Sequence, residues 1–182
     1  MKRNFSLILI SLMALVMISG CALTIKPAAT KSGKAYYESF FTEEGTMYFI
    51  KPIEFEGTDK KDKLFADFTF RHQTELPDTA IVNLSIESTD ILKKADRITF
   101  SNSSSEVSLE DISLLFNERK DKKFISRFSA KCPTNKLIAI IGDPSIQIKI
   151  TKEDSPSAVV FLPNKGSQKK IRTLNNNLFI LF

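Results

Sequence analysis

Hydrophobic and polar residues alternate along most of the chain from Tyr36 onward. The clearest cases are the segments 64–71, 80–87 and 146–151, and the same period of two recurs in 47–56, 98–100 and 124–128. This period is typical of half-buried antiparallel strands, with one face on a core and the other in water. Residues 158–162 are apolar throughout, as in a central strand. The pattern predicts a mostly antiparallel β fold.

The predicted strand 47–56 contains a proline, which limits where the strand can lie in a sheet. Met47, Phe49, Ile53 and Phe55 fall on one face if the alternation is continuous. Pro52 has no N–H for a sheet hydrogen bond. The strand is therefore predicted to lie at an edge or to carry a bulge.

Residues 107–123 allow two structures. Ser108 and Asp111 have the spacing of a capping box, and a helix would place Ile112, Leu115 and Phe116 on one face. Alternation of Ile112, Leu114 and Phe116 instead predicts a strand, followed by a polar hairpin loop over 117–123 that leads into Phe124. The hairpin is favoured, because the flanking segments are strands and a charged turn fits between them.

Two helices are predicted in the second half of the chain. Thr134 can cap residues 135–141, and Gly142 with Pro144 ends that helix. Ser167 can start a second helix, with an apolar face formed by Ile171, Leu174, Leu178 and Leu181. We expect the apolar tail 178–182 to dock on the strands. The predicted class is mostly β (α+β): an antiparallel β-sandwich with a short helix near 134–141 and a C-terminal helix, forming one domain over 35–182.

The N-terminus has the composition of a signal peptide. Lys2 and Arg3 precede a run from Phe5 to Met17 that is apolar except for Ser6 and Ser11. A membrane-spanning helix needs about 20 apolar residues, and this run is shorter and ends in small residues. It is therefore predicted to be a signal-peptide core.

The residues Ile18-Ser19-Gly20-Cys21 resemble the lipobox of bacterial lipoproteins. The resemblance implies removal of the signal peptide 1–20, a diacylglycerol on the thiol of Cys21, and an acyl chain such as palmitate on the new amino terminus. It also implies a cell-envelope location. Residue 22 is Ala and not Asp, which by the same resemblance directs the protein to the outer membrane if the cell is Gram-negative. Residues 21–34 form the lipidated Cys and a small, basic, flexible tether.

Lipidation of Cys21 would leave one free thiol. Cys132 is the other cysteine of the chain, so the mature protein is predicted to have no internal disulfide. Its place on an alternating face predicts a buried structural thiol that behaves as a small hydrophobic side chain.

The charge of the chain gives no reason to expect nucleic-acid binding. The formal net charge of +5 falls to +3 when Lys2 and Arg3 are removed with the signal peptide. Lys26, Lys31 and Lys34 lie in the tether, where each would contribute about 1 kcal/mol beside anionic headgroups. Acids and bases nearly cancel in the remainder, as on an ordinary solvated surface.

Residues for catalysis or metal binding are scarce. His72 is the one histidine, at a strand end and without Cys or carboxylates at ligand spacing. Glu43-Glu44 and Glu110-Asp111 are neighbours that point to opposite faces of a strand, and no Gly-x-Ser-x-Gly occurs. We therefore assign no catalytic, cofactor or metal residues. The sequence favours a non-enzymatic module that binds an envelope protein or glycan. The alternative is an envelope-polymer hydrolase with a carboxylate-based or His72-based site.

Replacing Cys21 tests the anchor. Cys21→Ser removes the thiol that accepts the diacylglycerol, so the variant should incorporate no radiolabelled palmitate and should keep its signal peptide. Wild-type protein and Cys132→Ser serve as the positive controls, since both retain Cys21. A Cys21→Ser chain that still incorporates palmitate would contradict the lipobox interpretation.

Overall fold

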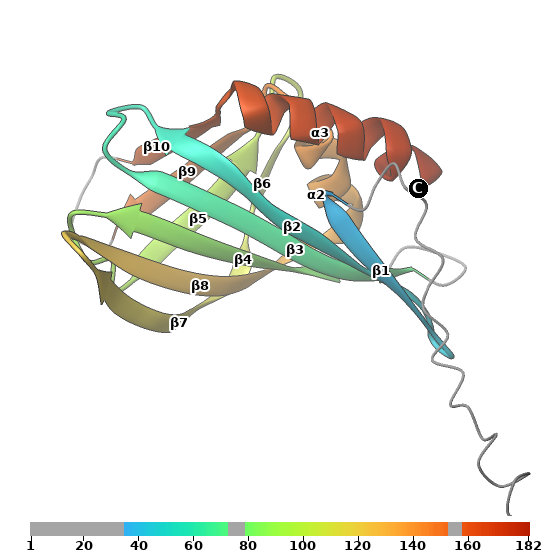
Figure 1. The fold of residues 1–182 in the computed structure, drawn as a ribbon, viewed down its shortest axis with the longest axis horizontal. Helices are drawn as coiled ribbons and strands as arrows, with labels where there is room; N and C mark the ends of the chain where they lie inside the picture. The colour runs from blue at the N-terminus through green and yellow to red at the C-terminus, as the bar shows by residue number, and fades with distance from the viewer. Residues whose placement is uncertain (1–34, 73–78, 153–157) are drawn as a thin grey trace, which may run out of the picture.

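The computed structural model describes residues 35–72, 79–152 and 158–182, and these form a sheet with two helices packed against it (Figure 1). The strands are β1 Tyr37–Thr42, β2 Gly45–Gly57, β3 Lys63–His72, β4 Thr79–Ser88, β5 Ala95–Ser101, β6 Glu106–Ser108, β7 Glu110–Lys120, β8 Lys123–Pro133, β9 Gln147–Lys152 and β10 Val159–Pro163. The helices are α2 Thr134–Ile141 and α3 Lys165–Asn177, and a 3-10 turn, η1 Phe179–Leu181, follows α3. Within these ranges no helix is long and apolar enough to cross a membrane.

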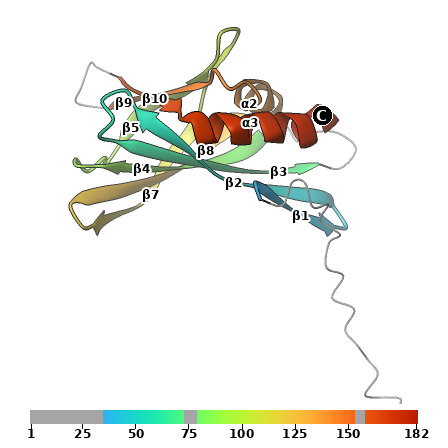
Figure 2. The same cartoon turned by 45° about the horizontal axis from the view of Figure 1, so that its top comes forward.

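All the described strands belong to one antiparallel sheet. Its order is β6-β5-β9-β10-β2-β3-β4-β8-β7, and β1 pairs with the N-terminal half of β2. The strands at the two ends of this order, β6 and β7, are joined through a single residue, Leu109. The Leu109 N–H donates a hydrogen bond of 2.8 Å to the Ile98 carbonyl of β5. The sheet therefore curls until it nearly closes on itself (Figure 2).

The predicted alternation places the core on the inner face of this curled sheet. The predicted inward residues of β3, β4 and β9 are all buried: Leu64, Ala66, Phe68, Phe70, Ala80, Val82, Leu84, Ile86, Ile148 and Ile150. Helix α2 packs at one end against β4, β5, β6 and β8, and α3 lies across β2 and β10. The mostly β class, the helix at 134–141 and the C-terminal helix are confirmed.

Strand β2 departs from the predicted face. Its pairing with β3 shifts register between Ile50 and Ile53, so the predicted bulge at Pro52 is present. The extra residue reverses the alternation, and the prediction that Met47 and Phe49 share the face of Ile53 is wrong. Ile50 points inward instead, and Phe49 is 42% exposed.

A lysine from α3 occupies the gap in hydrogen bonding beside Pro52. One edge of β2 pairs with β1 over residues 45–50 and with β10 over 55–57, so the residues around Pro52 have no strand partner there. The Lys170 Nζ donates hydrogen bonds to the Lys51 carbonyl at 3.0 Å and the Pro52 carbonyl at 2.7 Å. It also lies 5.6 Å from the centre of the Tyr36 ring. Lys170 thus supplies donors that a neighbouring strand would otherwise provide.

The ambiguous segment 107–123 is a hairpin, as favoured. Its loop is shorter than predicted, because β7 continues to Lys120 and β8 begins at Lys123. Asp121, in the turn, has a φ of 56°. The prediction of a loop over 117–123 is wrong because charged side chains can extend an edge strand whose faces are open to water.

Both helix starts differ from the predicted caps. Pro133 precedes α2 and the Thr134 side chain makes no capping hydrogen bond. Helix α3 starts earlier than predicted, since the Asn164 side chain accepts a hydrogen bond from the Ser167 N–H at 2.9 Å. Asn and Ser are both good N-cap residues, so the sequence alone does not decide whether Asn164 or Ser167 begins α3.

The C-terminal tail docks in part. Ile171, Leu174, Leu178 and Phe179 are buried, whereas Ile180 and Leu181 are 75% and 66% exposed. The helix ends at Asn177, and the following 3-10 turn rotates Leu181 away from the predicted face. The Phe182 ring packs edge-on against Tyr48 and Phe70 at 5.6 and 5.5 Å between ring centres.

Replacing Lys170 should destabilise the fold. Lys170→Met leaves the Lys51 and Pro52 carbonyls without their donor, so the free energy of unfolding should fall by about 1–3 kcal/mol in urea titrations. Lys169→Met is the matched control, because Lys169 is exposed on the same helix. Equal stability of the two variants would show that the Lys170 contacts contribute nothing.

The same variant also tests how Lys170 makes the free energy of unfolding depend on pH. Burial, together with the charge of Lys51, lowers the pKa of Lys170 from 10.5 to about 8. The unfolded chain then binds more protons between pH 8 and 10.5, so the free energy of unfolding of the wild type should rise with pH relative to Lys170→Met. A neutral amine keeps two N–H groups, so both hydrogen bonds survive deprotonation. A flat difference over this window would contradict the lowered pKa.

Candidate functional site

The strongest candidate site is a groove on the outer face of the sheet. It is lined by side chains of β2, β3, β4, β8 and β7, which lie side by side in Figure 1: Pro52, Phe65, Ser85, Glu87, Phe116, Glu118, Ile125 and Arg127. Its volume is about 430 Å³. Ligand pockets for small molecules typically lie between about 300 and 1,000 Å³. The groove is large enough for a sugar unit or a few amino-acid side chains.

Strand register builds the groove as rows of side chains. Phe65 pairs with Ser85, Ser85 with Arg127, and Arg127 with Phe116, which places the four in one row across β3, β4, β8 and β7. Directly paired residues lie on the same face of a sheet. The row therefore has an aromatic ring at each end and polar groups between them.

A polar network holds Arg127, which lies in the middle of the groove. Arg127 donates hydrogen bonds to the Ser85 hydroxyl at 2.6 Å and to a carboxylate oxygen of Asp67 at 2.9 Å. Asn83 donates to the other oxygen of Asp67 at 2.9 Å. The Arg127 and Asp67 side chains are only 26% and 17% exposed. These bonds fix the guanidinium and use two of its five N–H donors.

Glu87 of the groove lining and the nearby Glu54 both pair with lysines. Lys123 lies 3.2 Å from Glu87, and Lys63 lies 2.6 Å from Glu54. The hydrogen bond from Lys63 to Glu54 raises the pKa of that lysine. These are cross-strand ion pairs, whereas Glu118, the other carboxylate of the groove lining, lies in the same row as Glu87 with Ile125 between them. This arrangement suits polar recognition better than general acid–base chemistry.

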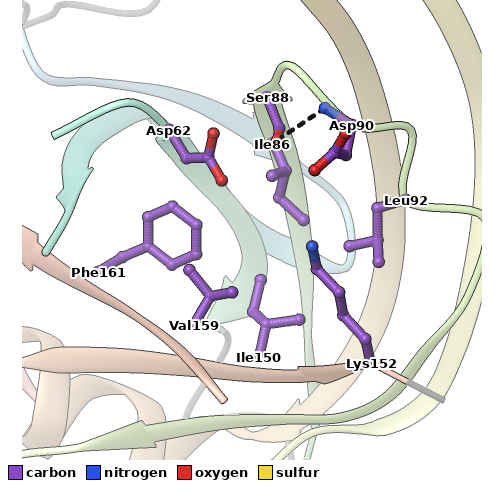
Figure 3. Close-up of a pocket in the computed structure, with 9 residues that line it drawn as sticks. All are labelled: Asp62, Ile86, Ser88, Asp90, Leu92, Ile150, Lys152, Val159 and Phe161. Atoms are coloured by element: carbon purple, nitrogen blue, oxygen red, sulfur yellow. Dashed lines mark hydrogen bonds between the residues drawn. The ribbon is translucent and has the colours of Figure 1, made fainter. Parts of the chain in front are cut away.

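A second hollow lies at one end of the curled sheet (Figure 3). Its apolar floor includes Ile86, Ile150 and Phe161, and charged residues Asp62, Asp90 and Lys152 lie at its rim. The enclosed space is about 10 Å³, which holds about one water molecule. The side chains of the core fill this end of the sheet, so this hollow has no room for an organic ligand.

The candidate residues from the sequence lie apart from the groove. His72 is at the end of β3, with its ring 4.8 Å from that of Phe182. Asp111 pairs with Lys131 at 2.8 Å, and Glu44 pairs with Arg71. No group of histidine, cysteine and carboxylate side chains suited to a metal ion occurs among residues 35–72, 79–152 and 158–182. Cys21 and the tether 21–34 lie outside the described residues.

Cys132 is buried, as expected for a structural thiol. It is 1% exposed, and burial raises its pKa to about 11. A thiol in this state is a poor nucleophile at neutral pH.

Comparisons of the chain with models of protein families, with curated proteins and with solved structures find no match.

Breaking the Arg127–Asp67 pair should destabilise the protein. Arg127→Met leaves a largely buried carboxylate with one amide donor, so the free energy of unfolding should fall by about 1–3 kcal/mol. Arg119→Met is the control, because Arg119 is exposed and binds only the Asp121 carbonyl. In Asp67→Asn protein the Arg127→Met change should cost less, which a double-mutant cycle in urea would measure. Additive effects would show that the two side chains are not coupled.

Proposed function

We propose that this protein is a lipid-anchored cell-envelope protein whose outer-face groove binds an envelope protein or glycan without catalysing a reaction. The observation that carries the proposal is the groove itself, with its aromatic ends and an internally bonded arginine between them. The anchor is proposed from the lipobox-like residues 18–21, and with it the outer-membrane location in a Gram-negative cell.

The chemistry of the groove supports binding. Phe65 and Phe116 offer flat apolar faces, on which a sugar ring or an apolar side chain can pack. Arg127 offers directed N–H donors for hydroxyl, carbonyl or carboxylate oxygens. Because Arg127 is already held by Ser85 and Asp67, little side-chain entropy is lost when a ligand binds.

The hydrolase alternative has weaker support. A carboxylate-based site needs two acids that converge on the bond to be cleaved. The two carboxylates that line the groove, Glu87 and Glu118, lie on either side of Ile125, and Glu87 contacts Lys123. The nearby Asp67 contacts Arg127. His72 packs against the C-terminal Phe182 and lines none of the hollows described above.

Two exposed neighbours on β7 provide the test. Phe116 lines the groove and Leu115 does not, although the two are 44% and 53% exposed. Phe116→Ser should weaken binding about tenfold or more through lost apolar contact, whereas Leu115→Ser should bind as the wild type does. Binding is measured with the full chain in two arms, on purified peptidoglycan sacculi and on detergent-solubilised envelope proteins.

The outcomes separate the ligand classes. Retention on sacculi that Phe116→Ser abolishes would identify a glycan. Retention of one envelope protein with the same dependence would identify a protein. Equal binding by both variants, or no retention in either arm, would rule out the groove as the binding site.

A further inference from the structure

Exposed large hydrophobic side chains gather at one end of the molecule. Strands β1, β2 and β3 project there as an arm, beside the C-terminus (Figures 1 and 2). We call these side chains the end patch: Phe40, Phe41, Phe49, Ile81, Ile180 and Leu181. Phe41 is 70% exposed and is the most open aromatic of the group. A cluster of this kind is unusual on a surface that faces only water.

The end patch covers both faces of the arm. Phe40 packs edge-on against Phe49 at 5.5 Å between ring centres, on the outer face. Register extends this face, since Phe49 pairs with Thr69 and Thr69 with Ile81. Phe41 follows Phe40 in β1 and therefore points to the opposite face.

The C-terminal residues extend the patch on that second face. Phe182 packs on Tyr48, Phe70 and His72, which ties the chain end to the arm. Ile180 and Leu181 of the preceding turn remain exposed. The apolar side chains therefore surround the end of the molecule and do not form one flat face.

Two of the three glutamates of β1 and the turn that follows it form ion pairs, and the third, Glu43, is exposed in that turn. Lys51 lies 3.0 Å from Glu38, and Arg71 pairs with Glu44. Ion pairs of this kind lower the cost of bringing a polar arm close to a low-dielectric medium. A bilayer interface, which accepts apolar side chains beside paired charges, fits such a surface.

The chain outside the described residues favours the bilayer as occupant. From Cys21 to Lys34 there are 14 residues, and residue 35 leads directly into β1 at the arm. With the flexibility that its composition predicts, a tether of this length would span about 20 Å, so a lipid on Cys21 would hold the end patch within reach of the headgroups. We infer that the end patch contacts the bilayer as a second, reversible membrane attachment; this inference rests on the proposed lipid anchor.

This contact would orient the groove. The arm and the turn between β2 and β3 lie at opposite ends of β2, whose 13 residues span about 40 Å. The groove residues Glu87 and Ile125 lie near this turn, because Glu87 stands opposite Lys63, the first residue of β3, in the strand register. With the arm on the membrane, the groove, which opens on the outer face of the sheet, lies toward the end of β2 that is farther from the bilayer.

The test places one label at each end of β2. Thr42→Cys and Thr58→Cys replace exposed threonines, at the arm and at the β2–β3 turn, and each is labelled with a polarity-sensitive dye. Cys132 is buried with a pKa of about 11, so it stays unlabelled at neutral pH. The full lipidated chain is inserted into preformed vesicles of phosphatidylethanolamine and phosphatidylglycerol.

The label at residue 42 should shift to the blue, lose most of its quenching by iodide and be quenched by nitroxide lipids. The label at residue 58 should remain open to iodide. Adding Phe40→Ser and Phe41→Ser should return the residue 42 label to water, and adding Leu114→Ser and Leu115→Ser, an exposed pair on β7, should not.

Any other result contradicts the proposed membrane contact. Palmitate incorporation then shows whether the proposed lipid anchor is also wrong. If palmitate is incorporated and the residue 42 label stays open to iodide, the anchor stands and the membrane contact is wrong. If the label is protected in native envelopes but not in protein-free vesicles, a protein covers the patch. If no palmitate is incorporated, the anchor and the contact fail together.

Discussion

Leu109 joins the two ends of the sheet, and the inner and outer faces follow from that closure. Strand β6 pairs with β5, β7 pairs with β8, and the Leu109 N–H binds the Ile98 carbonyl between them. A sheet curled in this way turns one side of most strands toward a shared core, while β1 and β7 have no buried residue. The inner face then needs no second sheet, because the inward phenylalanines and isoleucines pack on one another and on the two helices. The outer face of β3, β4, β8 and β7 stays free for polar and aromatic side chains.

Alternation in the sequence predicts the strands well because burial on one face repeats every two residues. It fails at Pro52, where one extra residue reverses the face and exposes Phe49. The proline indicates that a bulge is possible, but its effect on the face depends on the partner strand. The helix caps fail for a similar reason. Asn164 and Ser167 both suit an N-cap, and the end of β10 decides which residue begins α3.

The sequence does not predict the groove, although it predicts that some of the groove residues face outward. Phe65 and Asp67 fall on the outward row of one predicted strand, and Arg127 on that of another. Sixty residues separate Asp67 from Arg127, and their contact requires the order β3-β4-β8 together with its exact register. An aromatic residue on a polar row is the one signal that could have pointed to the outer face. Phe65 has that character, whereas Phe116 belongs to the apolar row Ile112, Leu114 and Phe116, whose exposure on an edge strand the alternation does not predict. Their meeting across four strands depends on the fold.

The proposed anchor and the end patch together would set the orientation of the domain, and of its groove, relative to the membrane. A single flexible tether holds a domain near a membrane but leaves it free to rotate, so a groove anywhere on its surface would face the bilayer part of the time. A second contact at the arm removes most of that freedom. Because β2 spans the molecule, the contact at one of its ends directs the other end outward. The proposed attachment would thus account for the exposed phenylalanines at the arm, which are costly in water, and would hold Arg127 and its aromatic neighbours away from the bilayer.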